Sequence, residues 1–153
     1  SENVFEKLRS HASSLGILEN LEIRGKVAYE ALPNELDGVD VGVCNVELNP
    51  FFYISSPSKV TSYLSLGIPT VVNSEIPNQH KLVIQSGGGF SVKYDVNDFS
   101  KAVLKLLNDK KLSHLMGSNG RKWVSKNRSY KALSISLTQR YSYLLNKNNS
   151  INK

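Results

Sequence analysis

The sequence predicts a doubly wound α/β fold, in which a parallel sheet is flanked by helices. Short runs rich in β-branched residues alternate with segments whose apolar residues recur at helical spacing. The connections between them are short, as is typical of parallel strands joined by crossover helices. With 153 residues, 40% of them hydrophobic and 21% charged, the composition is that of one globular domain. We expect this domain to cover residues 1–145, with residues 146–153 as a frayed polar tail.

The first half of the chain predicts five elements, several of them with a clear start or stop signal. They are a helix over residues 4–15, an extended stretch over 21–23, a helical turn over 33–36, a buried strand over 39–46 and a helix over 56–66. Gly16 and Gly67 stand where helix stops are expected. Ser56-Pro57 opens the last helix, because Ser is a favoured N-cap and Pro fits the first helical position. Cys44, within the strand, is expected to be a core residue.

The second half continues the alternation. Its predicted elements are a strand over residues 69–73, a helix over 78–85, a strand over 90–92, a helix after Asp95, a helix from Asp109 past Trp123 and a last helix over about 129–145. Asp95 is expected to cap the helix that follows it. The triple glycine Gly87–Gly89 favours a plain turn before a strand over a close approach to a ligand.

Two loops are candidate ligand sites, because ligands of open α/β sheets bind beyond the carboxyl ends of the strands. One loop, residues 47–57, leads into a helix start where Ser56, Ser58 and Lys59 suit a diphosphate. The other is the short loop Gly25-Lys26-Val27. Ordinary helix capping is the alternative explanation for the serines and the lysine.

The sequence contains no pattern typical of a metal site or of a catalytic nucleophile. His11, His80 and His114 are scattered without metal-ligand spacing, and Cys44 is the single cysteine. No phosphate-binding P-loop and no Gly-x-Ser-x-Gly nucleophile elbow is present. We therefore expect no metal, no cofactor and no disulfide. The absence of a long apolar run or a signal-like start favours a soluble protein in a reducing cytoplasm.

Positive charge gathers toward the C-terminus. From residue 101 onward there are twelve Lys or Arg and one acid, Asp109, a net charge of +11, whereas residues 1–100 carry −5. Such a segment predicts attraction to an anionic membrane surface, for which Lys122, Lys126, Arg128 and Lys131 are the candidate contacts. Solvated helix faces are the alternative. Binding to nucleic acid is disfavoured, because four aromatic residues show core-like helical spacing, namely Trp123, Tyr130, Tyr141 and Tyr143.

Several blocks of the sequence, in order, resemble one enzyme family. They are Leu32-Pro33-Asn34-Glu35-Leu36, Asp40-Val41-Gly42-Val43, Ser56 to Val72 with its Gly67-Ile68-Pro69, Gly88-Gly89-Phe90, Leu106 to Asp109 and Met116 to Arg121. Together they are similar to the C-terminal, donor-binding domain of the group 1 glycosyltransferases, retaining enzymes with two facing Rossmann-like domains in the arrangement called GT-B. The resemblance implies transfer of a sugar from a nucleotide-diphosphate sugar to a glycan or lipid-linked acceptor, as in polysaccharide assembly.

The resemblance also implies roles for particular residues. Backbone amides of Ser55 to Lys59 are expected on the donor diphosphate, and Gly25, Lys26 and Val27 against the base. Two glutamates that the family usually carries fall on Ile54 and Ser62, of which Ser62 retains a hydroxyl for the ribose. A non-catalytic binding or scaffold domain that has lost this acidic pair is therefore the alternative function.

The same resemblance implies that the sequence begins inside a longer protein. The first strand of the domain and the N-terminal acceptor domain are expected before Ser1. Because catalysis needs donor and acceptor held together in the cleft between two domains, the chain alone is expected to be inactive. We expect the enzyme in the cytoplasm, peripheral on the inner face of the membrane.

Overall fold

The computed structural model describes residues 2–151, and the chain divides into two units between Asp37 and Gly38. The first unit is helical and irregular. Its elements are α1 (Glu2–Ser14), the 3-10 turns η1 (Leu18–Asn20) and η2 (Tyr29–Ala31), and α2 (Leu32–Glu35). The predicted first helix and the turn at Pro33 are both present. That the two units belong to one domain over residues 1–145 stays a prediction.

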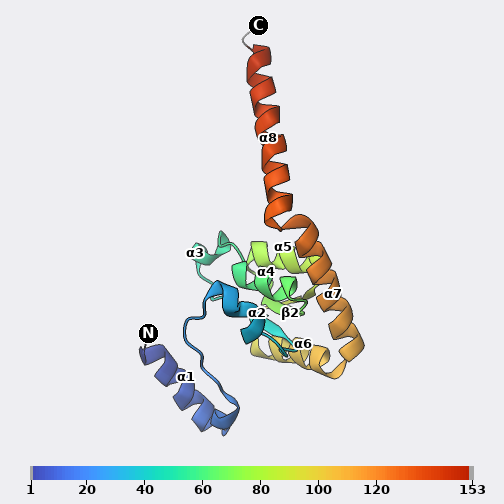
Figure 1. Ribbon diagram of the computed structural model, residues 1–153. Coiled ribbons are helices and arrows are strands. Elements are labelled where there is room, and N and C mark those ends of the chain that lie inside the picture. The colour runs from blue at the N-terminus through green and yellow to red at the C-terminus, as the bar shows by residue number, and fades with distance from the viewer. Residues whose placement is uncertain (1, 152–153) are drawn as a thin grey trace. The chain divides into compact units, whose positions relative to one another are not determined.

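The second unit contains a three-stranded parallel sheet flanked by helices (Figure 1), which confirms the predicted fold class. In chain order its elements are β1 (Gly42–Cys44), α3 (Pro50–Tyr53), α4 (Ser58–Ser65), β2 (Thr70–Asn73), α5 (Pro77–Ser86), β3 (Gly89–Val92), α6 (Val96–Asn108), α7 (Lys110–Asn127) and α8 (Tyr130–Ile151). The strand order is β1-β2-β3, with Thr70 opposite Gly42 on one side and Gly89 on the other. The carboxyl ends of the strands therefore meet at one edge of the sheet.

Apolar side chains cover both faces of the sheet. One core cluster joins β2 to α4, α5 and α7 through buried aliphatic residues: Val60, Leu64, Val72, Leu82, Val83 and Val124. On the opposite face, Val71 packs with Ala102 and Leu106 of α6. All four residues of β2 are buried, because this central strand is covered on both faces and paired along both edges.

Local sequence signals explain most of the helix boundaries. The Asp95 carboxylate accepts hydrogen bonds from the N–H groups of Asn97 and Asp98 at 2.9 and 3.1 Å, as an N-cap should. Asp109 caps α7 in the same way through Leu112 N–H at 3.0 Å. Gly87 ends α5 with a φ of 58°, a left-handed conformation that glycine adopts without strain. The predicted turn before a strand is present at Gly87 and Gly88, and Gly89 already belongs to β3.

Four sequence predictions need correction or extension. Helix α4 begins at Ser58 with Pro57 at the N-cap position, so Ser56 is not the cap that its residue type suggested. The first strand spans Gly42–Cys44 rather than residues 39–46, since β2 offers a short partner. Cys44 packs against the core with one side but is only half-buried. At the other end, α8 continues past residue 145 to Ile151, through much of the predicted tail.

Helix α7 approaches the turn after α4 so closely that a glycine is required at the contact. A Cβ atom on Gly117 would lie 2.0 Å from the carbonyl oxygen of Gly67. We expect Gly117→Ala to destabilise the protein by about 2 kcal/mol, since the backbones must move apart. Urea unfolding measures this. Ser118→Ala, at the next, exposed position of the same helix, is the control and should leave the midpoint nearly unchanged. Equal midpoints for the two variants would contradict the close packing.

Candidate functional site

A cavity of about 430 Å³ lies beyond the carboxyl end of β1, in front of the first turn of α4. Its walls come from the end of β1, the loop that follows, α4 and α5. The lining residues are Val43, Cys44, Asn45, Val46, Glu47, Phe52, Ser55, Ser56, Pro57, Ser58, Lys59, Tyr63 and Gln79. This is the place where open α/β sheets bind ligands.

The first turn of α4 presents backbone donors to this cavity. Proline has no side-chain acceptor, so Pro57 at the N-cap position leaves the helix start without the usual cap. Ser58 N–H already donates to Ser56 O at 2.9 Å and Val60 is fully buried, which leaves the amide of Lys59, a residue of the cavity wall, to meet a ligand. Together with the positive end of the helix dipole, this amide forms a site suited to an anion.

Lys59 adds a positive charge to the cavity wall. Burial raises the pKa of the Cys44 thiol, and the Lys59 ammonium, which lines the same cavity, lowers it in part. Burial also raises the pKa of Tyr63, and the Cys44 charge adds to that rise. Both the thiol and the phenol are therefore neutral at pH 7, and Lys59 remains as the cation facing the cavity.

A buried amide network fixes the loop that forms the cavity wall. The Asn73 side chain, fully buried at the end of β2, accepts hydrogen bonds through Oδ1 from Val46 N–H at 3.0 Å and from Gln79 Nε2 at 2.7 Å. A second link runs from Asn78 Nδ2 to Ser55 O at 3.0 Å. These bonds tie the segments after β1 and before α4 to α5.

A second cavity, of about 330 Å³, lies beside the same strand end. It shares Val43 and Asn45 with the first cavity, and its remaining wall comes from residues 94–96 and from Phe99 and Ser100 of α6. Glu75 holds this wall in place by accepting a hydrogen bond from Tyr94 N–H at 2.9 Å. Burial raises the pKa of Glu75, but this bond and those from neighbouring groups outweigh burial and lower it overall.

The structure gathers some of the sequence-predicted site residues and leaves others apart. Ser55, Ser56, Ser58 and Lys59 all line the first cavity, whereas its described lining does not include Ser62, which is half-buried one turn further along α4. Sequence reasoning missed the polar residues Asn45, Asn73 and Gln79. The first two stand directly at strand ends, which is the signal that points to them.

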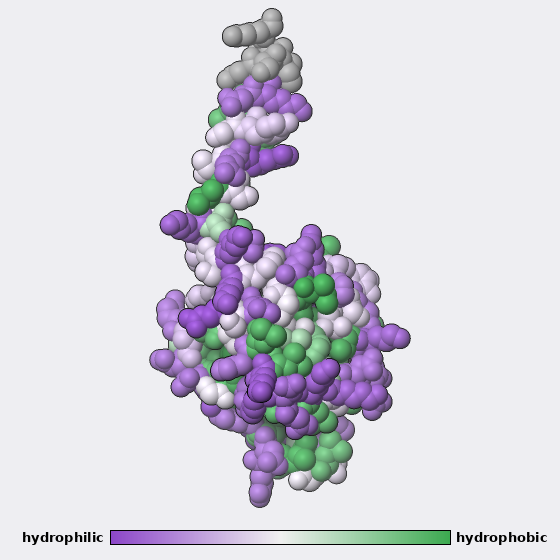
Figure 2. Space-filling model, turned by 90° about the vertical axis from the view of Figure 1, so that its right-hand side faces the viewer, coloured by the Kyte–Doolittle hydropathy of each residue, from purple (hydrophilic) through white to green (hydrophobic). Residues whose placement is uncertain are grey.

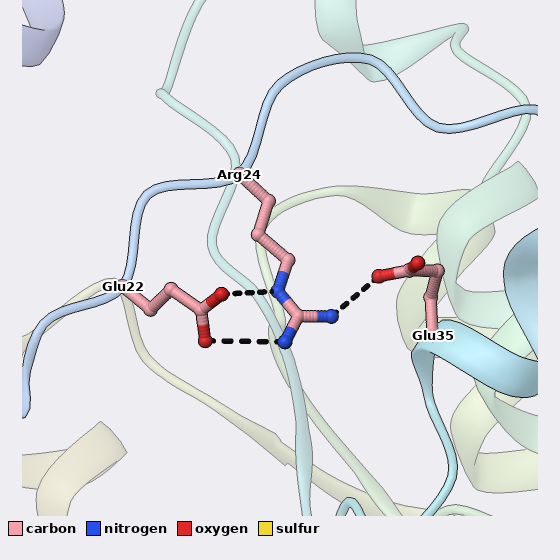
Figure 3. Close-up of polar contacts among 3 residues, drawn as sticks. All are labelled: Glu22, Arg24 and Glu35. Carbon is pink, nitrogen blue, oxygen red and sulfur yellow. Dashed lines mark hydrogen bonds and ion pairs between the residues drawn. The ribbon is translucent and has the colours of Figure 1, made fainter.

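The loop Gly25-Lys26-Val27 belongs to the first unit and is described there alone. Just before it, Arg24 bridges two carboxylates (Figure 3), with Nε 2.7 Å and Nη2 3.1 Å from Glu22 and a further bond from Nη1 to Glu35. The hydrogen bond and charge of Arg24 lower the pKa of Glu22. All three side chains are exposed to solvent, so this bridge organises the loop more than it stabilises the fold. Both of these contacts of Arg24 are with acidic side chains of the first unit.

Metal-binding side chains do not cluster in residues 2–151, where no three His, Cys, Asp or Glu residues meet in a suitable group. The expectation that the protein needs no metal or cofactor stays a prediction. Within the same residues, no helix combines the length and the apolar character needed to cross a bilayer.

Fold and site together define a Rossmann-like domain with an anion-binding cavity at the edge of its sheet. Comparison with protein families matches residues 1–123 to the family described as glycosyl transferases group 1. The chain therefore belongs to the group 1 glycosyltransferases, a family of sugar-transferring enzymes, and is a Rossmann-like half of the GT-B type. Comparisons with curated proteins and with solved structures give no match.

The Asn73 network yields a prediction about stability. Asn73→Ala removes the oxygen that accepts from the half-buried Val46 N–H and from the buried Gln79 amide, which keeps a longer 3.3 Å bond to the Asn73 backbone carbonyl, so we expect a loss of about 2 kcal/mol in the free energy of unfolding. Asn97→Ala, which removes an exposed amide on α6, is the control. Chemical denaturation measures both variants. An Asn73→Ala protein as stable as the control would mean that the amide does not hold the loop.

Proposed function

We propose that this chain is the donor-binding half of a retaining glycosyltransferase and that the cavity at the start of α4 binds the diphosphate of a nucleotide sugar. The observation that carries the proposal is the opening of the uncapped α4 N-terminus, with Lys59, into a cavity at the carboxyl end of β1. Membership of the family supports sugar transfer in general. The acceptor would be a glycan or a lipid-linked sugar.

The chemistry of sugar transfer explains why such a site is useful. When the bond between the anomeric carbon and the diphosphate oxygen breaks, the acceptor hydroxyl oxygen forms the new bond and its proton is released. Negative charge then develops on the departing nucleoside diphosphate. The amide of Lys59, the α4 dipole and the Lys59 ammonium are arranged to stabilise that charge without moving. Gly25, Lys26 and Val27 remain our proposed contacts to the base, and Ser62 to the ribose.

A second candidate function is a binding or scaffold domain without catalysis. Two positions favour it, since the family resemblance expects glutamates where this chain has Ile54 and Ser62. The Ile54 side chain is 85% exposed and has no polar group to offer a sugar. Titration of UDP and GDP into the protein separates the two candidates. The donor-binding function requires binding of one of them below millimolar concentration, and the scaffold function requires none.

Lys59 is the sharpest test of the anion site. Lys59→Ala removes one charge-assisted contact to phosphate, and we expect it to weaken nucleotide binding about tenfold, as measured by calorimetry. Lys59→Arg keeps the charge and should restore most of the affinity. Lys122→Ala, which removes an exposed lysine from α7, is the matched control and should bind like the unmodified protein. Binding that is equal in Lys59→Ala and Lys122→Ala would remove this helix start from the site.

The same proposal includes a location. We propose that the enzyme works in the cytoplasm, at the inner face of the membrane, where lipid-linked acceptors are found. The support is the net charge of +11 over residues 101–153. The candidate contacts Lys122, Lys126, Arg128 and Lys131 are all exposed.

A further inference from the structure

The first cavity has one acid and one base in its described lining. Glu47 lies in the loop after β1, and Lys59 lies in the first turn of α4. Both side chains are exposed, and neither forms a hydrogen bond or an ion pair within the part of the chain that the structure describes. A carboxylate and an ammonium thus share one cavity without pairing, so both charges are available to a ligand.

The backbone on both sides of the Glu47 side chain is held in place. Val46 N–H, just before it, donates to Asn73 Oδ1 at 3.0 Å, and Glu47 O accepts from Asn49 N–H at 2.8 Å. The carboxylate is therefore carried by a turn whose position is set by the end of β2. A fixed position of this kind is what a residue that recognises a ligand requires.

A carboxylate in this wall is unfavourable for a bare anion. The Lys59 ammonium and the α4 dipole attract phosphate, whereas the Glu47 charge repels it. A carboxylate only accepts hydrogen bonds, and its two oxygens can accept from two neighbouring hydroxyls. In a nucleotide sugar, the hydroxyls next to the diphosphate belong to the ribose on one side and to the sugar on the other. The two charges together therefore fit a ligand that carries both phosphate and hydroxyl groups.

Exposed charges elsewhere on the second unit lack such a setting. Figure 2 shows the face over α7, where hydrophilic side chains are mixed with apolar ones. The exposed lysines of that helix, such as Lys122 and Lys126, line neither of the two cavities described above. What distinguishes Glu47 and Lys59 is therefore their common cavity rather than their exposure.

We propose that Glu47 binds a pair of hydroxyls of the nucleotide sugar and thereby selects such ligands over anions without hydroxyls. The inference rests on the proposed function and deepens it, because it names the residue that distinguishes a nucleotide sugar from any other diphosphate. Ser62, proposed above for the ribose, is not in the described lining of the cavity, whereas Glu47 is.

The experiment is calorimetric titration of several ligands into the protein and into Glu47→Gln, which keeps the size of the side chain and removes its charge. The ligands are inorganic pyrophosphate, UDP and GDP, their 2′,3′-dideoxy forms, UDP-glucose and GDP-mannose. We expect pyrophosphate to bind about two- to threefold more tightly to Glu47→Gln, because the repulsion is gone. The ligand whose hydroxyls Glu47 binds should bind about tenfold more weakly, because charge-assisted hydrogen bonds are lost.

The same titrations identify the hydroxyls. If they belong to the ribose, UDP or GDP shows the loss and the dideoxy nucleotides do not. If they belong to the transferred sugar, the loss is absent for UDP and GDP and is present for UDP-glucose or GDP-mannose.

Two further variants serve as controls. Asp98→Asn removes the same charge from α6, on the opposite face of the sheet from α4, and should bind every ligand like the unmodified protein. Lys59→Ala should weaken pyrophosphate and nucleotides alike, whereas Glu47→Gln should change their affinities in opposite directions. A general effect of charge would not give that pattern.

A Glu47→Gln protein that binds all ligands as Asp98→Asn does, or that changes its affinity for all of them in the same direction, would overturn the inference. If the unmodified protein binds UDP or GDP, such a result leaves the donor site in place. If it binds neither nucleotide, the donor-site proposal fails and this inference fails with it.

Discussion

The Asn73 side chain is the constraint on which the candidate site depends. The half-buried N–H of Val46 and the buried Gln79 amide both donate to its one side-chain oxygen at the end of β2. That oxygen sets where the chain goes after β1, and the path after β1 forms one wall of the cavity. The carboxyl ends of the parallel strands lie at one edge of the sheet, and the Asn73 side chain holds the loop after β1 in place at that edge.

The chemistry of the cavity follows from what stands at the start of α4. A proline at the N-cap position is a poor choice for helix stability, because it leaves the first turn without a side-chain acceptor. The same choice leaves amides and a dipole for an anion to satisfy. A residue that is unfavourable for helix stability but leaves the helix start open to a ligand is typical of a binding site. The neutral Cys44 and Tyr63 line part of the wall, whose charged residues are Lys59 and Glu47.

The fold could be predicted from the sequence because its signals are local. The structure contains the elements that local signals predicted: strands at the β-branched runs, helices that begin after Asp95 and Asp109, and helices that end before a glycine. The cavity was harder to predict. Gln79 lies on α5 and is bonded to Asn73 at the end of β2, and no spacing in the sequence indicates that contact. Tyr130, Tyr141 and Tyr143 of α8 have the helical spacing of core residues in the sequence, but their rings are exposed in the structure. Helical spacing tells which side chains share a face, but only the packing of other segments tells whether that face is covered.

The central claim is that the α4 N-terminus binds the diphosphate of the donor. Nuclear magnetic resonance of the ¹⁵N-labelled protein tests it most directly, because the amide signals report on each backbone N–H when UDP or inorganic pyrophosphate is added. We expect the largest shift at the amide of Lys59, with smaller ones at the amides of Ser55, Ser56 and Ser58. Shifts that cluster elsewhere, or no change at these amides with millimolar ligand, would contradict the claim.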